Sequence, residues 1–175
     1  MKSTLITFGI AILIVVVYYY GKKFYLKPGI DTGVKAEEIT GLLPDGTTFS
    51  LSDLQDKYVL LDFWGSWCKP CREEHPELIK LYDTYHSANY KQGSGFEIVS
   101  FAVERNPESW KEAIRQDQLI WPYHLVSSTL FDDPVVKKYN VRQIPTRFLI
   151  NSKGFIVAVD PSITQIKRIL DEYKE

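Results

Sequence analysis

The sequence has little cysteine and little histidine, and this scarcity excludes several kinds of site. Cys68 and Cys71 are the only cysteines among 175 residues. A structural zinc ion takes about four ligands, and no second cysteine pair is present to supply them. An attachment site for haem would need histidine at position 72, which is Arg72. The histidines are scattered along the chain, at His75, His86 and His124. We therefore expect no metal site and no cofactor.

The sequence also lacks an excess of charge of either sign. Its 21 basic and 22 acidic residues give a net charge of -1. No global field therefore favours binding to nucleic acid. Internal repeats and low-complexity tracts are missing as well. The length suits roughly one domain, and a hydrophobic content of 45% is ample for a packed core.

Charge is absent from one long stretch, Ser3 to Gly21. As a helix, this stretch would extend about 28 Å, close to the roughly 30 Å hydrocarbon core of a bilayer. Three tyrosines and then Lys22 and Lys23 follow the apolar run, an order typical of a membrane interface. A cleaved signal peptide and a buried core helix are the alternatives. Bulky tyrosines stand where a cleavage site needs small residues, so the sequence predicts a transmembrane anchor over residues 1–21.

A polar segment rich in glycine and proline separates this stretch from the rest of the chain. It predicts a linker over residues 22–35 and a folded domain over residues 36–175. The domain should begin with two short strands, residues 38–42 and 47–51, around the turn Pro44-Asp45-Gly46. Ser52 and Gln55 have the spacing of a capping box and could open one helical turn.

Strands and helices alternate through the rest of the domain. We expect strands at residues 58–63, 96–103 and 121–126, and a hairpin over residues 146–159. Helices are expected after Cys71, from Asn106-Pro107, from Asp133-Pro134, and from a capping box at Ser162. The pattern predicts an α/β fold with a mixed central sheet and helices on both faces.

The strand over residues 58–63 leads into Trp67-Cys68-Lys69-Pro70-Cys71. A strand that delivers two cysteines to the start of a helix suits thiol:disulfide exchange. The helix N-terminus stabilises a thiolate, and the second thiol is near enough to close a disulfide. Cys68 is the predicted nucleophile, and Cys71, one turn inside the helix and more buried, resolves the mixed disulfide. A purely structural disulfide is the alternative.

The chain resembles the thioredoxin superfamily, and within it the membrane-anchored TlpA/ResA-like thiol:disulfide oxidoreductases. The resemblance covers about residues 39–170 and is carried by Asp62-Phe63-Trp64, the cysteine motif, Pro76, and the segment Val141-Arg142-Gln143-Ile144-Pro145-Thr146. It implies a thioredoxin-like three-layer fold with an N-terminal β-hairpin. That hairpin is also found in peroxiredoxins, but their Pro-x-x-x-Thr-x-x-Cys setting is missing before Cys68, which disfavours a peroxidase.

The resemblance also implies two catalytic acids. Asp62 lies inside an apolar strand, where burial without a partner would disfavour its charged form. The matching aspartate of thioredoxins accepts the proton of the second cysteine. Glu74 lies three residues beyond Cys71 and matches an active-site glutamate of the ResA-like branch. Ser100 stands where thioredoxins carry a lysine, so the proton route should differ. A local hydrogen bond at the strand end is the alternative for Asp62.

Pro145 matches the cis-proline that faces the cysteines in this family. In that position the Ile144 backbone can pair with an extended client segment. Trp67, Lys69 and Pro70 complete the predicted substrate-binding surface, with Trp64 as a further candidate for its apolar rim. An ordinary trans proline is the alternative. His75 has no predicted chemistry and should be solvated or packed.

The combined prediction is a membrane-tethered thiol:disulfide oxidoreductase that reduces protein disulfides. Its partners would be protein disulfide or dithiol clients, a membrane or soluble thiol electron donor, and a membrane through residues 3–21. A count of flanking lysines leans towards a cytoplasmic domain. The habit of the anchored family nevertheless places the domain on the extracytoplasmic side, periplasmic or cell-surface. A non-catalytic redox-sensing or metal-capturing assembly factor, and a thiol peroxidase, are the alternatives.

Overall fold

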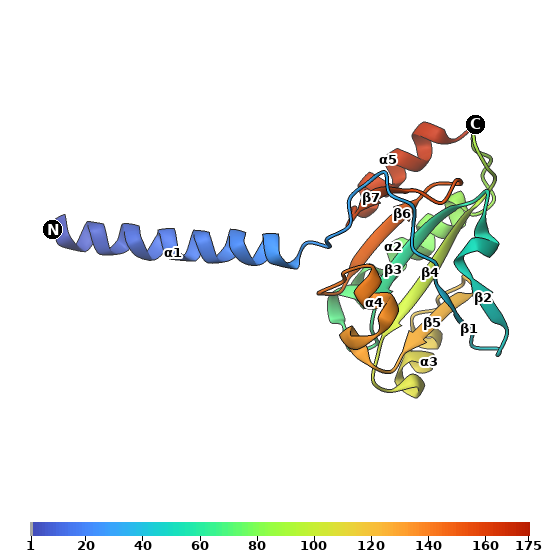
Figure 1. The fold of residues 1–175 in the computed structure, drawn as a ribbon, viewed down its shortest axis with the longest axis horizontal. Helices are drawn as coiled ribbons and strands as arrows, with labels where there is room; N and C mark the ends of the chain where they lie inside the picture. The colour runs from blue at the N-terminus through green and yellow to red at the C-terminus, as the bar shows by residue number, and fades with distance from the viewer. Residues whose placement is uncertain (1) are drawn as a thin grey trace.

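The computed structural model describes residues 2–175, and the side chains of residues 6–22 and 25–175. The central sheet contains β5 (Tyr123–Ser127), β4 (Phe96–Val103), β3 (Tyr58–Trp64), β6 (Thr146–Ile150) and β7 (Ile156–Val159), in that order. Strand β3 runs parallel to β4 and antiparallel to β6, and β5 runs parallel to β4. The predicted mixed sheet is therefore confirmed (Figure 1).

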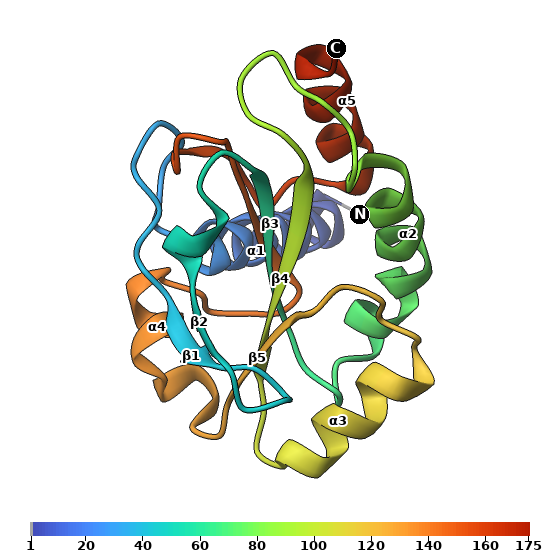
Figure 2. The same ribbon diagram turned by 90° about the vertical axis from the view of Figure 1, so that its right-hand side faces the viewer.

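Helices cover the sheet on both faces, as Figure 2 shows. One face packs against α2 (Lys69–Tyr85), α3 (Pro107–Gln116) and α5 (Ile163–Tyr173). The other packs against the hairpin β1 (Thr40–Leu42) and β2 (Thr48–Ser50), the short helix η1 (Leu51–Leu54) and α4 (Pro134–Lys138). A further turn, η2 (Leu130–Asp132), precedes α4.

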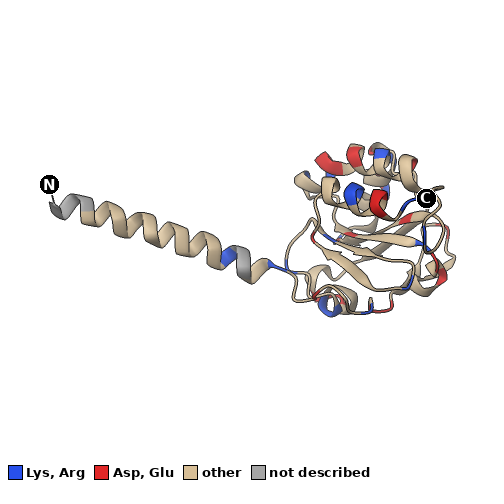
Figure 3. Ribbon diagram, turned by 90° about the horizontal axis from the view of Figure 1, so that it is seen from above, with Lys and Arg blue, Asp and Glu red and all other residues tan. Residues whose placement is uncertain are grey.

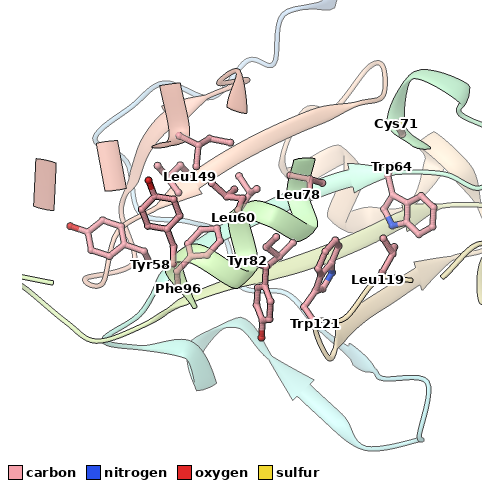
Figure 4. Close-up of a cluster of buried hydrophobic side chains, with 14 of the residues drawn as sticks. Tyr58, Leu60, Trp64, Cys71, Leu78, Tyr82, Phe96, Leu119, Trp121 and Leu149 are labelled. Atoms are coloured by element: carbon pink, nitrogen blue, oxygen red, sulfur yellow. The ribbon is translucent and has the colours of Figure 1, made fainter. Parts of the chain in front are cut away.

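Strand β3 is buried along its whole length, and its side chains alternate between these faces. Tyr58, Leu60 and Trp64 pack under α2, in the cluster shown in Figure 4. Val59, Leu61 and Phe63 pack against the hairpin side. Asp62 lies between Leu60 and Trp64 in this alternation, so the register places its carboxylate on the α2 face.

The hairpin and the final helix follow their local sequence signals. Gly46 has a φ of 86°, as the Pro-Asp-Gly turn requires. Helix α5 begins at the predicted capping box, with Ser162 and Gln165 bonded to each other's backbone N–H. The capping box predicted at Ser52 is wrong. The capping box lies two residues earlier, because η1 begins directly after β2. The Asp53 carboxylate accepts the N–H of Ser50 at 2.9 Å.

The N-terminal helix α1 (Lys2–Leu26) extends away from the domain (Figure 1). It continues five residues past Gly21, where the sequence predicted the anchor to end. Met1, the first residue of that predicted anchor, lies outside the described residues. Within the described part of the chain, no helix combines the length and the hydropathy needed to cross a membrane. The structure therefore does not support the predicted transmembrane segment.

The end of the predicted linker is attached to the sheet. The N–H of Gly33 donates to the Ile156 carbonyl oxygen at 2.8 Å, and the N–H of Ile156 donates to the Val34 carbonyl oxygen at 2.9 Å. The edge of β7 is therefore partly covered by residues from the lead-in. Acidic and basic residues are intermixed along the ribbon of the domain (Figure 3).

Candidate active site

The cysteine pair lies where β3 ends and α2 begins. Cys68 is the N-cap of α2, with extended backbone angles, and Pro70 occupies the first turn, where a missing N–H leaves no bond unmade. The N–H of Cys71 donates to the Sγ atom of Cys68 at 3.2 Å. A sulfur at a helix N-terminus that accepts a backbone N–H is in the position where negative charge on a thiolate is favoured. The position of Cys68 at the start of the helix is the one that the sequence predicted.

Cys68 and Cys71 form a disulfide in this structure, with a Cα–Cα distance of 5.3 Å. Cys68 is 4% exposed and Cys71 is 1% exposed. Cys71 is thus the more buried of the two, the order expected of a resolving thiol. Among the described residues, no group of histidine, cysteine and carboxylate side chains could hold a metal ion.

The loop before Cys68 is fixed to the end of β4. The Trp67 Nε1–H donates to the Val103 carbonyl oxygen at 3.0 Å, and the Ser66 N–H donates to the Glu104 carboxylate at 3.0 Å. The same carboxylate accepts the Arg105 N–H at 3.0 Å. Glu104 is buried and was not found from the sequence, because its partners are backbone groups that leave no pattern in the residues.

The two predicted acids meet at a third residue, Arg147, that sequence reasoning missed. Arg147 lies opposite Asp62 in the β3–β6 register. Its Nε–H donates to Asp62 Oδ1 at 2.8 Å, and its Nη2–H donates to Glu74 Oε2 at 2.8 Å. Asp62 is 1% exposed and Arg147 is 4% exposed. The expectation of an unpartnered Asp62 is therefore wrong, since the buried carboxylate has a buried counter-charge.

The charge on Arg147 is held firmly. Burial disfavours the charged guanidinium, but the nearby charges of Asp62 and Glu74 outweigh burial and raise the pKa of Arg147 above its ordinary value. A cation that stays protonated between two carboxylates forms a fixed bridge from the sheet to α2.

A second ionic cluster lies beside the cysteines on α2. Arg72 donates to both oxygens of Asp117, at 2.9 and 2.6 Å. The Nδ1 atom of His75 lies 2.7 Å from Asp117 Oδ2, and its ring contacts Trp64 edge-on. Burial opposes the charged Asp117 carboxylate, but Arg72 and His75 outweigh it and lower the pKa of Asp117. His75 is packed, one of the two environments expected for it.

The polar side chains under α2 continue across the sheet. Ser100 of β4 lies beside Asp62 in the strand register, and His124 of β5 lies beside Ser100. The Trp121 Nε1–H donates to Ser100 Oγ at 2.9 Å, and the Trp121 ring stacks on His124. Burial lowers the pKa of His124 to about 4, although the Trp121 backbone acts in the opposite direction. The position of the thioredoxin lysine is thus occupied by a neutral hydroxyl.

Three of the residues predicted to bind a client are close to Cys68 in the sequence, and Ile144 packs against the core cluster that contains both cysteines. The Ile144–Pro145 peptide bond is cis, as the resemblance implies. Ile144 is half-buried and packs against both core clusters. Trp67 is 54% exposed, and Lys69 and Pro70 are exposed as well. Trp64 is fully buried, so it belongs to the core and not to an exposed rim.

Comparison with known proteins assigns this geometry to a family. The family model described as AhpC/TSA matches residues 32–159. The thiol-disulfide oxidoreductase ResA of Bacillus subtilis is 32% identical over 140 residues, covering 80% of this chain and 73% of that protein. The ResA of Geobacillus kaustophilus is 32% identical, covering 82% of this chain and 80% of that protein.

Solved structures give the same assignment. The thioredoxin domain of a thiol-disulfide oxidoreductase from Bacteroides vulgatus has a TM-score of 0.73 and 30% identity, covering 82% of this chain and 98% of that one. A thiol:disulfide interchange protein from Bacteroides sp. has a TM-score of 0.71 and 32% identity, covering 82% of this chain and 90% of that one.

Proposed function

We propose that this chain reduces protein disulfides while attached to a membrane. The chain belongs to the AhpC/TSA family and is a thiol:disulfide oxidoreductase of the ResA/TlpA type. The observation that carries the proposed chemistry is the position of Cys68. Its sulfur caps α2 and accepts the Cys71 N–H, so in the reduced protein the start of the helix favours the thiolate form of Cys68.

The reaction begins with the reduced pair. The Cys68 thiolate attacks one sulfur of a client disulfide, a Cys68–client disulfide forms, and the other client sulfur leaves as a thiolate. Cys71 then loses its proton and attacks Cys68. The Cys68–Cys71 disulfide closes, the bond to the client breaks, and the second client sulfur leaves. Two electrons have moved to the client, and a thiol donor returns the pair to the dithiol.

Proton acceptance by Asp62 and Glu74 completes this scheme. Glu74 lies one turn beyond Cys71 on α2, so the two side chains share a helix face. Asp62 lies on the strand face that α2 covers. Either carboxylate can take the proton that Cys71 gives up, because Glu74 is on the helix that carries the thiol, Asp62 lies on the strand face beneath that helix, and Arg147 joins the two.

Client docking is proposed for the surface around the exposed Trp67. An extended client segment would pair with the Ile144 backbone next to Pro145 and would contact Trp67, Lys69 and Pro70. The direction of electron flow is proposed from the Lys-Pro pair between the cysteines, which resembles that of reductases in this superfamily.

The proposed reaction is tested by trapping. A Cys71→Ser variant should accumulate a disulfide-linked adduct between Cys68 and a client, because the resolving thiol is absent. Cys68→Ala should form no adduct and should lose catalytic reduction of a protein disulfide. Stoichiometric metal binding without turnover would contradict the enzyme and favour an assembly factor. Oxidation of Cys68 by peroxide faster than free thiol would favour a peroxidase.

Membrane attachment through residues 1–21 is proposed with the domain on the extracytoplasmic side. It is supported by the uncharged stretch from Ser3 to Gly21 and by the exposure of the described apolar side chains of α1, from Ile6 to Tyr20. A membrane-impermeant thiol reagent should label the reduced cysteines in intact cells. Protection of both cysteines in intact cells, with labelling after lysis, would contradict this orientation.

A further inference from the structure

The Arg147 side chain joins three elements that surround the cysteine pair. It starts on β6, two residues after Pro145, and reaches Asp62 on β3 and Glu74 on α2. Its carbonyl oxygen also accepts the Asp160 N–H at 2.7 Å, which fixes the backbone at this point. Because the guanidinium is planar and its donors diverge at fixed angles, one side chain sets the positions of both carboxylates.

Asp62 is on the sheet face that α2 covers, and Glu74 is on α2 itself. Cys71 belongs to the same buried cluster as Leu60 and Trp64, the β3 residues on either side of Asp62 on that face. Figure 4 shows Cys71 and Trp64 at one end of this cluster and Leu60 nearer its middle. Glu74 is three residues beyond Cys71 on the helix. Arg147 thus acts on groups that flank the resolving thiol.

Three acidic residues lie around the single positive charge of Arg147. Asp62 comes from β3, Glu74 from α2, and Asp160 from the segment after β7. Burial raises the pKa of Asp160, and Arg147 acts in the opposite direction. Without the guanidinium, the Asp62 and Glu74 carboxylates would have no common counter-charge, and their like charges would repel each other. Neither carboxylate would then be held in a fixed position.

We propose that Arg147 is a positioning residue that holds the Asp62 and Glu74 carboxylates in place between the sheet and α2, so that a proton acceptor is in position when Cys71 attacks. This role rests on the proposed function of the two acids. In the step that it serves, the Cys71 proton passes to a carboxylate and the Cys71 sulfur attacks Cys68. The bond from Cys68 to its partner breaks, and the partner sulfur leaves with the electron pair.

The test measures the attack of Cys71 on Cys68 by stopped flow, after 5,5′-dithiobis(2-nitrobenzoate) is added to the reduced protein. Attack by Cys68 releases one coloured thiolate, and attack by Cys71 on the mixed disulfide releases the second. In Arg147→Met the second release should be slower by about a hundredfold at pH 6, the lower end of what a positioned base contributes. The deficit should shrink as pH rises to 9, because a thiol with an ordinary pKa of about 8.5 then ionises without a positioned base.

The rate of the second release in Arg147→Lys should lie between the wild-type rate and the Arg147→Met rate, since a lysine supplies one point charge and cannot bridge both acids. Arg168→Met, an exposed arginine on α5, is the matched control and should behave like the wild-type protein. A folded Arg147→Met variant whose deficit is the same at every pH would overturn the proposal, because a merely structural loss has no reason to follow proton availability.

A double change keeps the test decisive if Arg147→Met does not fold. Asp62→Asn with Arg147→Met removes both buried charges together, and its second release should show the same deficit at pH 6, shrinking towards pH 9. A folded double variant that matches the wild-type rate at pH 6 would overturn the proposal. The reagent is not a protein, so failure to reduce client disulfides would contradict the proposed function without deciding this test.

Discussion

The two faces of the central sheet differ at adjacent rows of the same strands. On the face under α2, one row across β6, β3, β4 and β5 is polar throughout: Arg147, Asp62, Ser100 and His124. On the face under the hairpin, the next row is built of apolar and aromatic side chains: Phe148, Leu61, Val99 and Tyr123. Both rows are covered by other elements.

This difference separates chemistry from stability within one sheet. Burying polar groups costs free energy unless each is paired, so a polar row in a core indicates a role other than stability. The polar row ends at the ion pair between Asp62 and Arg147, beneath the helix that carries Cys71. The apolar row has no such groups, and its role is to hold the strands together.

Phe63→Ala tests the role of the apolar face and has the largest expected effect on stability. Phe63 is fully buried, and its ring lies 5.5 Å from that of Phe101 and 5.6 Å from that of Tyr139. The truncation should lower the free energy of unfolding by about 4 kcal/mol, from lost burial and a cavity. Urea unfolding measures this loss.

The exchange rate per folded Phe63→Ala molecule should stay within about twofold of wild type, since the changed side chain faces away from α2. Phe155→Ala is the control, because Phe155 is 40% exposed and its truncation should lower the free energy of unfolding by only about 1 kcal/mol. A large fall in the exchange rate of the folded variant would show that the two faces do not divide these roles.

His124 should make the polar face sensitive to pH. Its folded pKa of about 4 lies below the ordinary 6.5, so the unfolded chain takes up a proton first as pH falls. The stability due to neutral His124 is complete above about pH 6.5 and is lost as pH falls towards 4. Over that window the loss should reach about 3 kcal/mol.

His124→Phe should flatten this part of the pH profile, because the stack on Trp121 is kept and the titrating ring is removed. Urea unfolding at pH 4.5 and pH 7 measures the difference between the variant and the wild-type protein. His86→Gln is the matched control, since the His86 side chain is 46% exposed and its change should leave the profile nearly intact. An equal pH dependence in wild type and His124→Phe would contradict the assigned burial effect.

Local signals in the sequence predicted most of the fold. The turn at Gly46, the capping box at Ser162 and the cysteine pair at the start of a helix each depend on residues a few positions apart. Such signals are readable because the interacting groups are neighbours in the chain. The cis bond at Pro145 was implied only by the family resemblance, since few X-Pro bonds are cis.

The bridge through Arg147 could not be derived in the same way. Asp62 and Arg147 are 85 residues apart, and only the pairing of β3 with β6 brings them together. One signal was present, because each is a single charge inside an apolar strand, and the two charges are opposite. The network of Arg72, His75 and Asp117 had no comparable signal, since Asp117 comes from the end of α3 and not from an apolar strand.

Glu104→Gln tests the end of β4 beside the cysteine loop and has the smallest expected effect on stability. Glu104 follows β4 directly, and its two carboxylate oxygens accept the N–H groups of Ser66 and Arg105. A glutamine side chain keeps one acceptor and turns an NH₂ group towards the other N–H. The loss of one charge-assisted bond should lower the free energy of unfolding by about 2 kcal/mol.

The position of Glu104 gives this variant a local readout as well. The Ser66 amide lies in the loop that sets the start of α2, so its hydrogen exchange should become faster in Glu104→Gln, while amides in the middle of β3 keep the protection that global unfolding allows. Glu108→Gln on α3 is the control, because the Glu108 side chain is 78% exposed and pairs only with Lys111 among its described ionic contacts. If Ser66 exchanges at the wild-type rate while stability falls, the carboxylate supports the strand end and not the cysteine loop, and the cysteine loop is then held by the Trp67 bond to Val103.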